Sequence, residues 1–315
     1  MTGPGSAGGR RTICIVCPVF NEELNIEHFY GEVTRVIAPL RERYDFTLLF
    51  SNNASSDRTL ELIRGLAAKD SAVRYLTLSR NFGYQGSLLA ALSHAEGDAF
   101  VIIDVDCEDP PRLIPQFIEQ WEAGYDLVYG IRGARPEFIG LVWMRRLFYR
   151  VTRLIADADF IVDMAEFSLF SRRLRDAALA NETTFPFIRA ELAFVGFPRK
   201  GIPYDRERRA FGDTHYSFGR MAQFAIAGIL SASTFPLRAI AYLGLPLAAV
   251  NLAASLAALV GYGVNLSALF ALDWAFLIVA AAFIGLYAAR IYKDGIRRAR
   301  FIVDEAKSML DGKRT

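Results

Sequence analysis

The chain has 315 residues, of which 53% are hydrophobic and 22% are charged, and its formal net charge is +2. This length allows one large domain or two ordinary ones with a well-buried core. The net charge is too small to indicate a nucleic-acid partner, and none is predicted. The apolar fraction is high for a soluble protein, which indicates a local apolar region.

The first 130 residues alternate short apolar runs with longer amphipathic ones. The predicted strands are residues 12–17, 46–51, 73–79, 99–104 and 126–131. The predicted helices between them are residues 25–43, 57–69, 84–95 and 112–123. This alternation predicts an α/β fold with a mostly parallel sheet between helices, in which ligands bind beyond the carboxyl ends of the strands. Residues 1–11 have no apolar core and are predicted to be a disordered tail.

The three cysteines fit a reducing compartment. Cys14 and Cys17 have the spacing of a redox pair, but they lie in a predicted strand, where positions three apart point to opposite faces. Core packing is therefore predicted for both, and also for Cys107.

Polar residues follow each of the first four predicted strands. The four segments are 18–23, 52–57, 80–83 and 104–109. In the last of them Asp104 and Asp106 lie two residues apart, so both carboxylates of an extended chain can approach one divalent ion. Mg²⁺ and Mn²⁺ prefer such oxygen ligands. The alternative is a solvated acidic loop, because an isolated Asp-x-Asp is a weak signal.

Glycine-rich phosphate loops are missing from the sequence. There is no G-x-x-x-x-G-K-[ST], and the first predicted strand runs into PVFNEE where a dinucleotide fold has G-x-G-x-x-G. A bound nucleotide would therefore be held through a metal ion and side chains.

The apolar excess lies near the C-terminus. Residues 239–272 contain no charged residue, and a second uncharged run covers residues 274–289. Since a bilayer core needs about 20 apolar residues per helix, we predict transmembrane helices near 239–260 and 269–290. The alternative is a pair of buried helices in a soluble core.

The region before the spans, residues 216–237, is predicted to be an amphipathic interface helix, with an ordinary core helix as the alternative. Basic residues flank both spans, at Arg238, Arg290, Lys293, Arg297, Arg298 and Arg300. The positive-inside rule then predicts a multi-pass protein of the inner (cytoplasmic) membrane, with both termini and the catalytic domain in the cytoplasm. Residues 292–315 are predicted to be a cytoplasmic tail.

Several motifs together support a resemblance to a known family. CPVFNEELNI follows the first strand, S-x-x-D-x-T the second, LSRNFGYQGSLLAALSHAEGD the third and DVDCEDPP the fourth. This combination resembles the family-two glycosyltransferases. The second half of the chain resembles the polyprenyl-phosphate group of this family, which includes dolichyl-phosphate mannose synthase and the bactoprenol glucosyltransferases. The residues that carry this resemblance are VGF-x-x-x-GIPYDR-x-x-R-x-x-GDT-x-Y, then STFPLR, two spans and GLYAARIY. The resemblance covers roughly residues 12–305.

The resemblance implies a GT-A fold over residues 12–215, followed by the interface helix and two transmembrane helices. It implies transfer of a sugar from a nucleotide-sugar, with UDP favoured, to undecaprenyl phosphate with inversion. Mg²⁺ or Mn²⁺ would be held by Asp104 and Asp106, and Glu166 would be a third catalytic carboxylate. A homo-oligomer, plausibly a tetramer, and a separate flippase for the product are further implications.

The same resemblance implies two binding sites. Residues of the donor site would be Pro18, Phe20, Asn21, Glu22, Asn53, Asp57, Arg80, Gln85 and Asp104. Residues binding the acceptor phosphate would be Arg206, Arg209 and His215. Two alternatives stay open: Glu22 caps the following helix, and the two arginines pair with Asp205 and Glu207.

The sequence departs from the family pattern at four places. Asn52-Asn53 stands where D-D is usual, Ala165 and Ser168 replace a glycine and an arginine in G-D-F-R-L, and His215 replaces a lysine. Histidine is mostly neutral at pH 7, and if two phosphates hold His215 charged, activity should fall as the pH rises. The departures leave two other functions open: transfer onto a saccharide or glycolipid hydroxyl, with Glu166 or Asp109 as base, and an inactive membrane scaffold.

Overall fold

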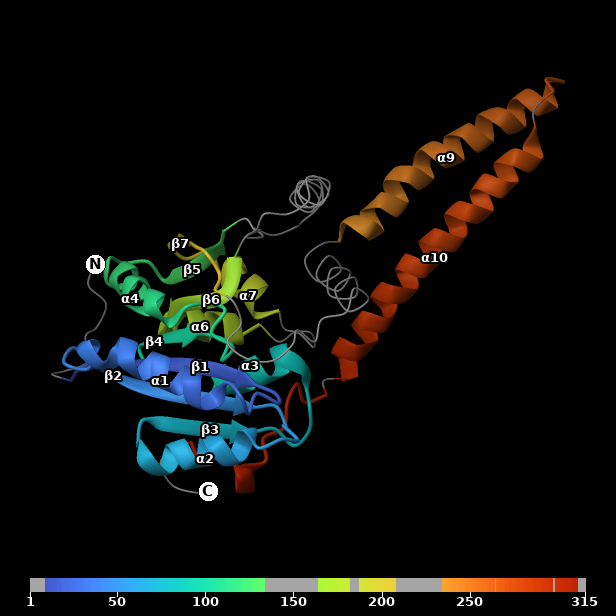
Figure 1. Cartoon of the computed structure of the whole chain (residues 1–315). Coiled ribbons are helices and arrows are strands. Elements are labelled where there is room, and N and C mark those ends of the chain that lie inside the picture. Colours follow the sequence, from blue (N-terminus) through green and yellow to red (C-terminus); the bar gives the residue numbers. More distant parts are fainter. Residues whose placement is uncertain are drawn as a thin grey trace. The chain divides into compact units, whose positions relative to one another are not determined.

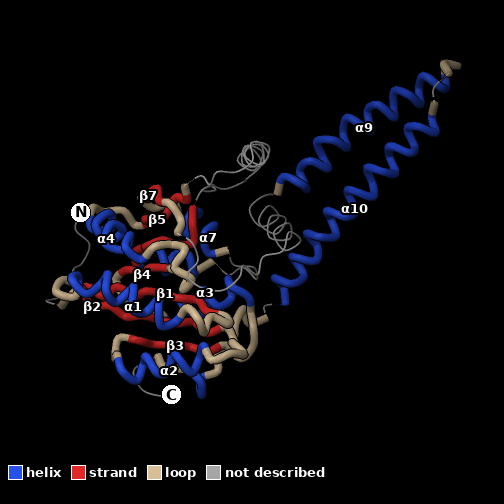
Figure 2. The backbone as a smooth tube through the Cα atoms, viewed as in Figure 1, coloured by secondary structure: helices blue, strands red, loops and turns tan. Residues whose placement is uncertain are grey.

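The structure, a computed structural model, describes residues 9–133, 164–181, 187–207, 234–263, 265–296 and 298–310 (Figures 1 and 2). Contacts divide it into two units. The described residues up to 207, together with 299–310, form the first unit, and those from 234 to 298 form the second.

The first unit contains a seven-stranded sheet with the order β3-β2-β1-β4-β6-β5-β7. The strands are β1 (Arg11–Val19), β2 (Tyr44–Asn52), β3 (Val73–Thr77), β4 (Ala99–Ile102), β5 (Leu127–Arg132), β6 (Met164–Ser171) and β7 (Arg199–Tyr204). All neighbouring pairs are parallel except that β6 runs antiparallel to both β4 and β5. The predicted mostly parallel α/β sheet is confirmed, and β7 and the antiparallel strand β6 are additions that the sequence pattern did not predict.

Helices cover both faces of this sheet. They are α1 (Ile26–Ile37), α2 (Thr59–Lys69), α3 (Gly83–His94), α4 (Ile114–Glu122), α6 (Arg172–Leu179) and α7 (Ile188–Phe194). Apolar side chains of α1, α2 and α4 join one core cluster, whereas those of α3, α6 and α7 join the other. Short 3₁₀ turns lie at Ala38–Leu40, Pro111–Leu113 and Glu305–Lys307.

Strand β1 shows why its sequence is apolar at every position. Side chains alternate across a strand, so both faces of a central strand are buried when helices cover both. Cys17 accordingly lies in the first cluster and Cys14 in the second, as predicted, and both thiols are free and buried. Burial raises the pKa of the Cys14 thiol to about 12, so neither the geometry nor the protonation state suits redox exchange.

The second unit is a pair of long apolar helices, α9 (Phe235–Leu259) and α10 (Leu266–Ile296). A helix of 25 residues is about 37 Å long, which exceeds the roughly 30 Å hydrocarbon core of a bilayer. Large apolar side chains are exposed on both helices, for example Leu245 on α9 and Trp274 and Ile278 on α10. Both helices are long and apolar enough to cross a membrane. Their apolar side chains are exposed, whereas the alternative prediction of a soluble core requires them to be buried.

A polar contact joins the two long helices. Asn251 of α9 donates a hydrogen bond of 2.8 Å to Asp273 of α10, which is the single charged residue between 239 and 289. Of the predicted interface helix, residues 216–233 lie outside the described residues.

Candidate active site

The loops after β1, β2, β3 and β4 share an unusual backbone feature. Each contains one residue with positive φ: Asn21 at 55°, Ala54 at 57°, Gly83 at 79° and Cys107 at 57°. Asn21, Ala54 and Cys107 are the only non-glycine residues with positive φ among the described residues. Gly83 is one of four described glycines with positive φ. Such conformations cost about 1 kcal/mol or more for a residue with a side chain, and they gather at functional sites. The strain marks the carboxyl ends of these strands as the candidate site.

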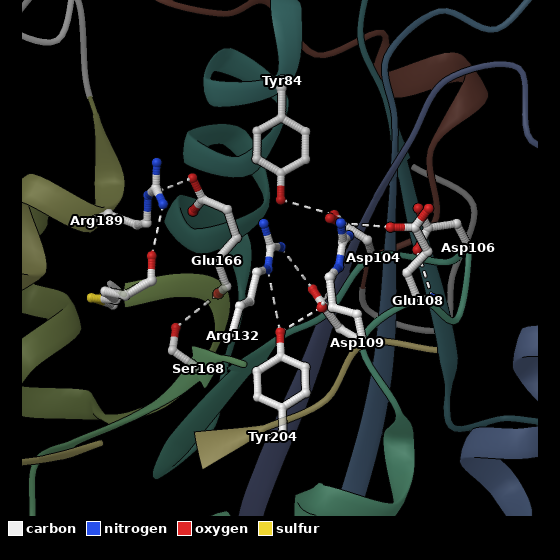
Figure 3. A network of polar contacts seen from close by, with 12 residues as sticks. Tyr84, Asp104, Asp106, Glu108, Asp109, Arg132, Glu166, Ser168, Arg189 and Tyr204 are labelled. Atoms are coloured by element: carbon white, nitrogen blue, oxygen red, sulfur yellow. Dashed lines mark hydrogen bonds and ion pairs between the residues drawn. The ribbon is translucent and has the colours of Figure 1, made fainter. Parts of the chain in front are cut away.

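The acidic run after β4 divides into two pairs (Figure 3). The first pair is neutralised inside the protein. Asp109 is 1% exposed, and its carboxylate lies 3.0 Å from Arg132 and 3.1 Å from Arg206. Arg206 also lies 2.6 Å from Glu108. The hydroxyl of Tyr204 donates a further hydrogen bond to Asp109. Glu108 and Asp109 therefore bind the loop after β4 to the segment around β7.

The second pair, Asp104 and Asp106, has no such partner. The Tyr84 hydroxyl donates to Asp104 at 2.9 Å, and Asp106 accepts the backbone N–H of Glu108 at 3.1 Å. Within the described ranges neither carboxylate forms an ion pair. Burial, followed by repulsion from Asp106 and Asp109, raises the pKa of Asp104 to about 7. Two adjacent carboxylates with this much uncompensated negative charge fit a divalent cation.

The donor set also indicates which cation. No group of three or more His, Cys, Asp or Glu side chains forms a metal shell in the part of the chain that the structure describes. Two carboxylates without further protein ligands suit Mg²⁺ or Mn²⁺, which fill their remaining positions with water and substrate phosphate oxygens. The residues present thus fit the predicted ion.

Glu166, on β6, lies in a second polar cluster (Figure 3). Its Oε1 accepts a hydrogen bond from Gln85 at 3.3 Å and lies 3.1 Å from Nε of Arg189. Its Oε2 is buried and has no hydrogen-bond partner among the described residues. Burial raises the pKa of Glu166, and the charge of Arg189 opposes that shift. One oxygen is therefore held in place, while the other is left for a donor from a ligand.

Gln85 and Arg189 are themselves held by backbone groups. Gln85 accepts the N–H of Ile188 at 3.0 Å, and Arg189 donates to the carbonyl of Met164 at 2.7 Å. Sequence reasoning found Gln85 but missed Arg189. The only local signal for Arg189 is a basic residue at the second position of the short helix α7, which is too common to identify it.

Several predicted donor-site residues have structural contacts within the loops. Asn53 accepts the N–H of Phe82 at 2.9 Å and donates to Asn81 at 3.0 Å. Asp57 accepts the N–H groups of Glu23 and Thr59, at 3.1 and 3.0 Å. These contacts join the first three loops to one another and to the start of α2.

Asn21 and Glu22 have similar local contacts. Asn21 accepts the N–H of Ser56 at 2.8 Å. The carboxylate of Glu22 accepts from the Asn25 side chain at 2.6 Å, and its carbonyl accepts the Asn25 N–H at 2.9 Å. Glu22 thus lies before α1 and contacts its N-cap residue Asn25 through the Asn25 side chain, and no side-chain hydrogen bond caps α1 at Asn25.

The remaining donor-site candidates differ in exposure. Pro18 is buried within β1, whereas Phe20 is 44% exposed. The Arg80 guanidinium lies 3.9 Å above the centre of the Phe82 ring and remains exposed. Ser168, at the site of a family departure, is buried and donates to the carbonyl of Glu166 at 3.0 Å, so it serves packing within β6. Of the predicted acceptor-phosphate residues, Arg209 and His215 lie outside the described residues.

Residues 14–185 match the family model described as glycosyl transferase family 2, which is more than half of the chain, and the protein belongs to this family. The GT-A-type sheet and the two C-terminal apolar helices expected from the resemblance are both present.

Within this family the chain is related to bactoprenol glucosyl transferases. It is 37% identical over 239 residues to a prophage bactoprenol glucosyl transferase homolog of Escherichia coli, covering 76% of this chain and 78% of the relative. It is 32% identical over 306 residues to the bactoprenol glucosyl transferase of Shigella phage SfV, covering 94% and 99%. An uncharacterized glycosyltransferase of Bacillus subtilis is 35% identical over 235 residues, covering 73% and 71%.

Among solved structures, a mannosyltransferase from Pyrobaculum calidifontis in complex with GDP-Man and Mn²⁺ is similar to this chain. The TM-score is 0.48 at 21% identity, and the match covers 92% of this chain and 87% of that one.

Proposed function

We propose that the protein is a membrane-anchored glycosyltransferase that moves a sugar from a nucleotide-sugar, with UDP favoured, to undecaprenyl phosphate. The observation that carries this proposal is the pair Asp104 and Asp106 at the strained rim of the sheet, which form no ion pair with the described residues, whereas Glu108 and Asp109 are neutralised by arginines. The polyprenyl acceptor rests on the relatives, since the Shigella phage transferase matches over nearly its whole length, including the C-terminal helices.

In this proposal Asp104 and Asp106 hold Mg²⁺ or Mn²⁺ and thereby fix the donor's diphosphate. When bound, the ion supplies Lewis-acid stabilisation of the negative charge that develops on the leaving nucleotide. Tyr84 orients Asp104 through its hydrogen bond. The end of β1 at Pro18 and the loops that carry the other predicted donor-site residues are proposed to surround the nucleotide; those residues are Phe20, Asn21, Glu22, Asn53, Asp57 and Arg80.

Glu166 is proposed to orient the donor sugar. Its Oε2 is buried and lacks a partner among the described residues, so it can accept a hydrogen bond from a sugar hydroxyl. Arg189 and Gln85 hold the carboxylate for this contact.

The acceptor needs little activation by the protein. A phosphate monoester is ionised at neutral pH, so it can attack the anomeric carbon without a general base, and inversion follows from in-line displacement. Placing two anions in line requires cations, and Arg209 and His215 are proposed for the lipid phosphate. Arg206, whose Nε and Nη1 pair with Asp109 and Glu108, is proposed to order the segment that leads to them.

The membrane assignment follows from the acceptor and the two apolar helices. A polyprenyl tail stays in the bilayer, so the active site must reach the headgroup region. We propose that α9 and α10 span the inner membrane with both termini and the catalytic domain in the cytoplasm, that the protein is a homo-oligomer, plausibly a tetramer, and that a separate flippase exports the product.

The test is to incubate the protein in nanodiscs with undecaprenyl phosphate, Mn²⁺ and a panel of nucleotide-sugars, and to determine the mass of the lipid product. A product with an acid-labile sugar phosphodiester, whose formation stops with EDTA, is the expected result. A stable glycosidic bond to a saccharide or glycolipid would replace this proposal with hydroxyl transfer, for which the raised pKa of Glu166 would suit a base. No turnover of any donor would favour a membrane scaffold.

A further inference from the structure

The last described segment of the first unit runs along β3, the outermost strand of the sheet. Ser79 donates its N–H to the carbonyl of Ile302 at 2.9 Å, and Asp304 donates to the carbonyl of Thr77 at 2.8 Å. Tyr75 and Met309 exchange both backbone hydrogen bonds, at 3.0 and 2.7 Å. We call residues 300–310 the C-terminal strap. The sequence had indicated only a tail here.

The side chains of the C-terminal strap alternate as in a strand. Phe301 and Val303 pack against the core cluster that also contains α3, whereas Ile302 between them is 52% exposed. The Phe301 ring meets the His94 ring edge-on, with 5.9 Å between centroids. Further along, Ser308 is buried and accepts the N–H of Thr77 at 2.9 Å. The strap is therefore docked by apolar anchors as well as by backbone bonds.

Thr77 connects the C-terminal strap to the loops of the candidate site. Its hydroxyl donates to the carbonyl of Lys307 at 3.0 Å and accepts from the Asn52 side chain at 3.4 Å. Asn52 in turn accepts the N–H of Ser55 at 3.1 Å, and the Ser55 hydroxyl accepts the N–H of Asn21 at 3.0 Å. This series of hydrogen bonds reaches the loops after β2 and β1.

A second connection reaches the loop after β3. Ser79, bonded to Ile302, immediately precedes Arg80. At the start of α3, a Cβ placed on Gly86 would come within 3.5 Å of the Arg300 carbonyl, so the strap passes close to this helix. Three of the four loops at the rim are thus tied to the strap.

We propose that the C-terminal strap positions the donor-binding loops, with Thr77 as the residue that transmits this positioning. The inference rests on the proposed function for its substrate, a nucleotide-sugar. The competing explanation is that the strap only covers an exposed sheet edge, which proteins do to prevent association. Edge covering requires the backbone bonds and the apolar anchors, but it does not require the link from Thr77 to Asn52.

The test compares full-length variants in nanodiscs. Thr77→Val keeps the β-branched shape and removes the hydroxyl that joins Asn52 to Lys307. Loss of the two hydrogen bonds of this hydroxyl should raise the KM for the nucleotide-sugar about five-fold and leave the KM for undecaprenyl phosphate unchanged. The Tm should also fall, because the buried Asn52 side chain loses this partner. The matched control is Lys307→Gln, which removes the exposed ion pair with Asp304 but keeps the carbonyl, and it should behave as wild type.

Hydrogen–deuterium exchange gives a readout that does not depend on turnover. In Thr77→Val and Ser308→Ala the amides of residues 52–56 and 79–83 should exchange faster than in wild type and in the control. The two proposals can fail separately. If the wild-type protein transfers no sugar, the proposed function fails, but faster amide exchange in these variants still supports positioning of the loops by the strap. Unchanged exchange with an unchanged donor KM would overturn the inference. A fall in Tm with equal changes in both KM values would overturn it in favour of edge covering.

Discussion

Arg206 Nη1 lies 2.6 Å from Glu108 Oε2, and this contact separates two kinds of acidic residue within one loop. Glu108, with its neighbour Asp109, is used to hold the chain together. Asp104 and Asp106 remain as the carboxylates whose charge the described residues do not compensate.

Asp106→Asn should abolish transfer and stabilise the metal-free protein. Repulsion from Asp106 is one of the causes of the raised pKa of Asp104, so removing its charge relieves the site when no cation is present. The measurements are the rate of lipid product formation and the Tm in EDTA. Asp45→Asn, which alters only an exposed pair with Arg10, should leave both unchanged. Transfer at a near-normal rate by Asp106→Asn would contradict the metal role.

Arg206→Ala and Arg209→Ala should have different effects. Arg206→Ala leaves Glu108 and the buried Asp109 with less compensation, and it should lower the free energy of unfolding by about 2 kcal/mol. Arg209→Ala should leave that free energy unchanged and raise the KM for undecaprenyl phosphate. Denaturation curves and acceptor kinetics on both variants separate the two roles. An equal loss of stability in both would show that Arg209 also serves the fold.

Arg189→Ala should move the pH dependence of transfer. Burial raises the pKa of Glu166 and Arg189 opposes it, so without the guanidinium Glu166 keeps its proton to a higher pH. The acidic limb of the rate profile should therefore shift to higher pH, whereas Arg189→Lys, which keeps the charge, should shift it less. A profile that keeps its position, with only a lower plateau, would mean that Arg189 does not act through Glu166.

Glu122→Gln should remove a contribution to stability that depends on pH. The Tyr44 hydrogen bond, with support from Arg43 and Arg11, lowers the pKa of Glu122 below its usual 4.5. A lowered pKa in the folded protein stabilises it above pH 4.5, and this stabilisation is lost as the pH falls through the folded-state pKa.

Wild type should therefore exceed Glu122→Gln by about 1 kcal/mol at neutral pH, and the difference should shrink in acid. Unfolding free energies at pH 7 and pH 3 measure this. Glu61→Gln, which alters an exposed pair with Arg58, should have little effect at either pH. A constant difference between wild type and Glu122→Gln would exclude the charge of Glu122 as its cause.

Much of the first unit could be predicted because its signals are local. The apolar runs that became β1 to β5 are short and separated by longer helical segments, and each predicted strand overlaps an observed one. The two long apolar helices could also be predicted, since an uncharged run of that length is typical of transmembrane helices. Strand β6 was not predicted, because its antiparallel place between β4 and β5 depends on pairing with strands distant in the sequence.

The candidate site was predictable in its location but not in its internal roles. The position of Asp104 and Asp106 at a strand end follows from the sequence pattern. The internal roles depend on segments that meet only in the folded chain. Asn53 and Asp57 form hydrogen bonds within the loops, and Arg189 lies beside Glu166.

By itself, the sequence determined the alternation of strands and helices, the acidic pair at the rim and the two apolar helices. These follow from periodicity and composition, which act over a few turns or residues. Three features depend on the folded chain: which acidic residues Arg206 neutralises, which oxygen of Glu166 lacks a partner among the described residues, and the path of the C-terminal strap along β3. Those outcomes depend on charges and hydrogen-bonding groups brought together from distant parts of the chain, and the local pattern carries no record of them.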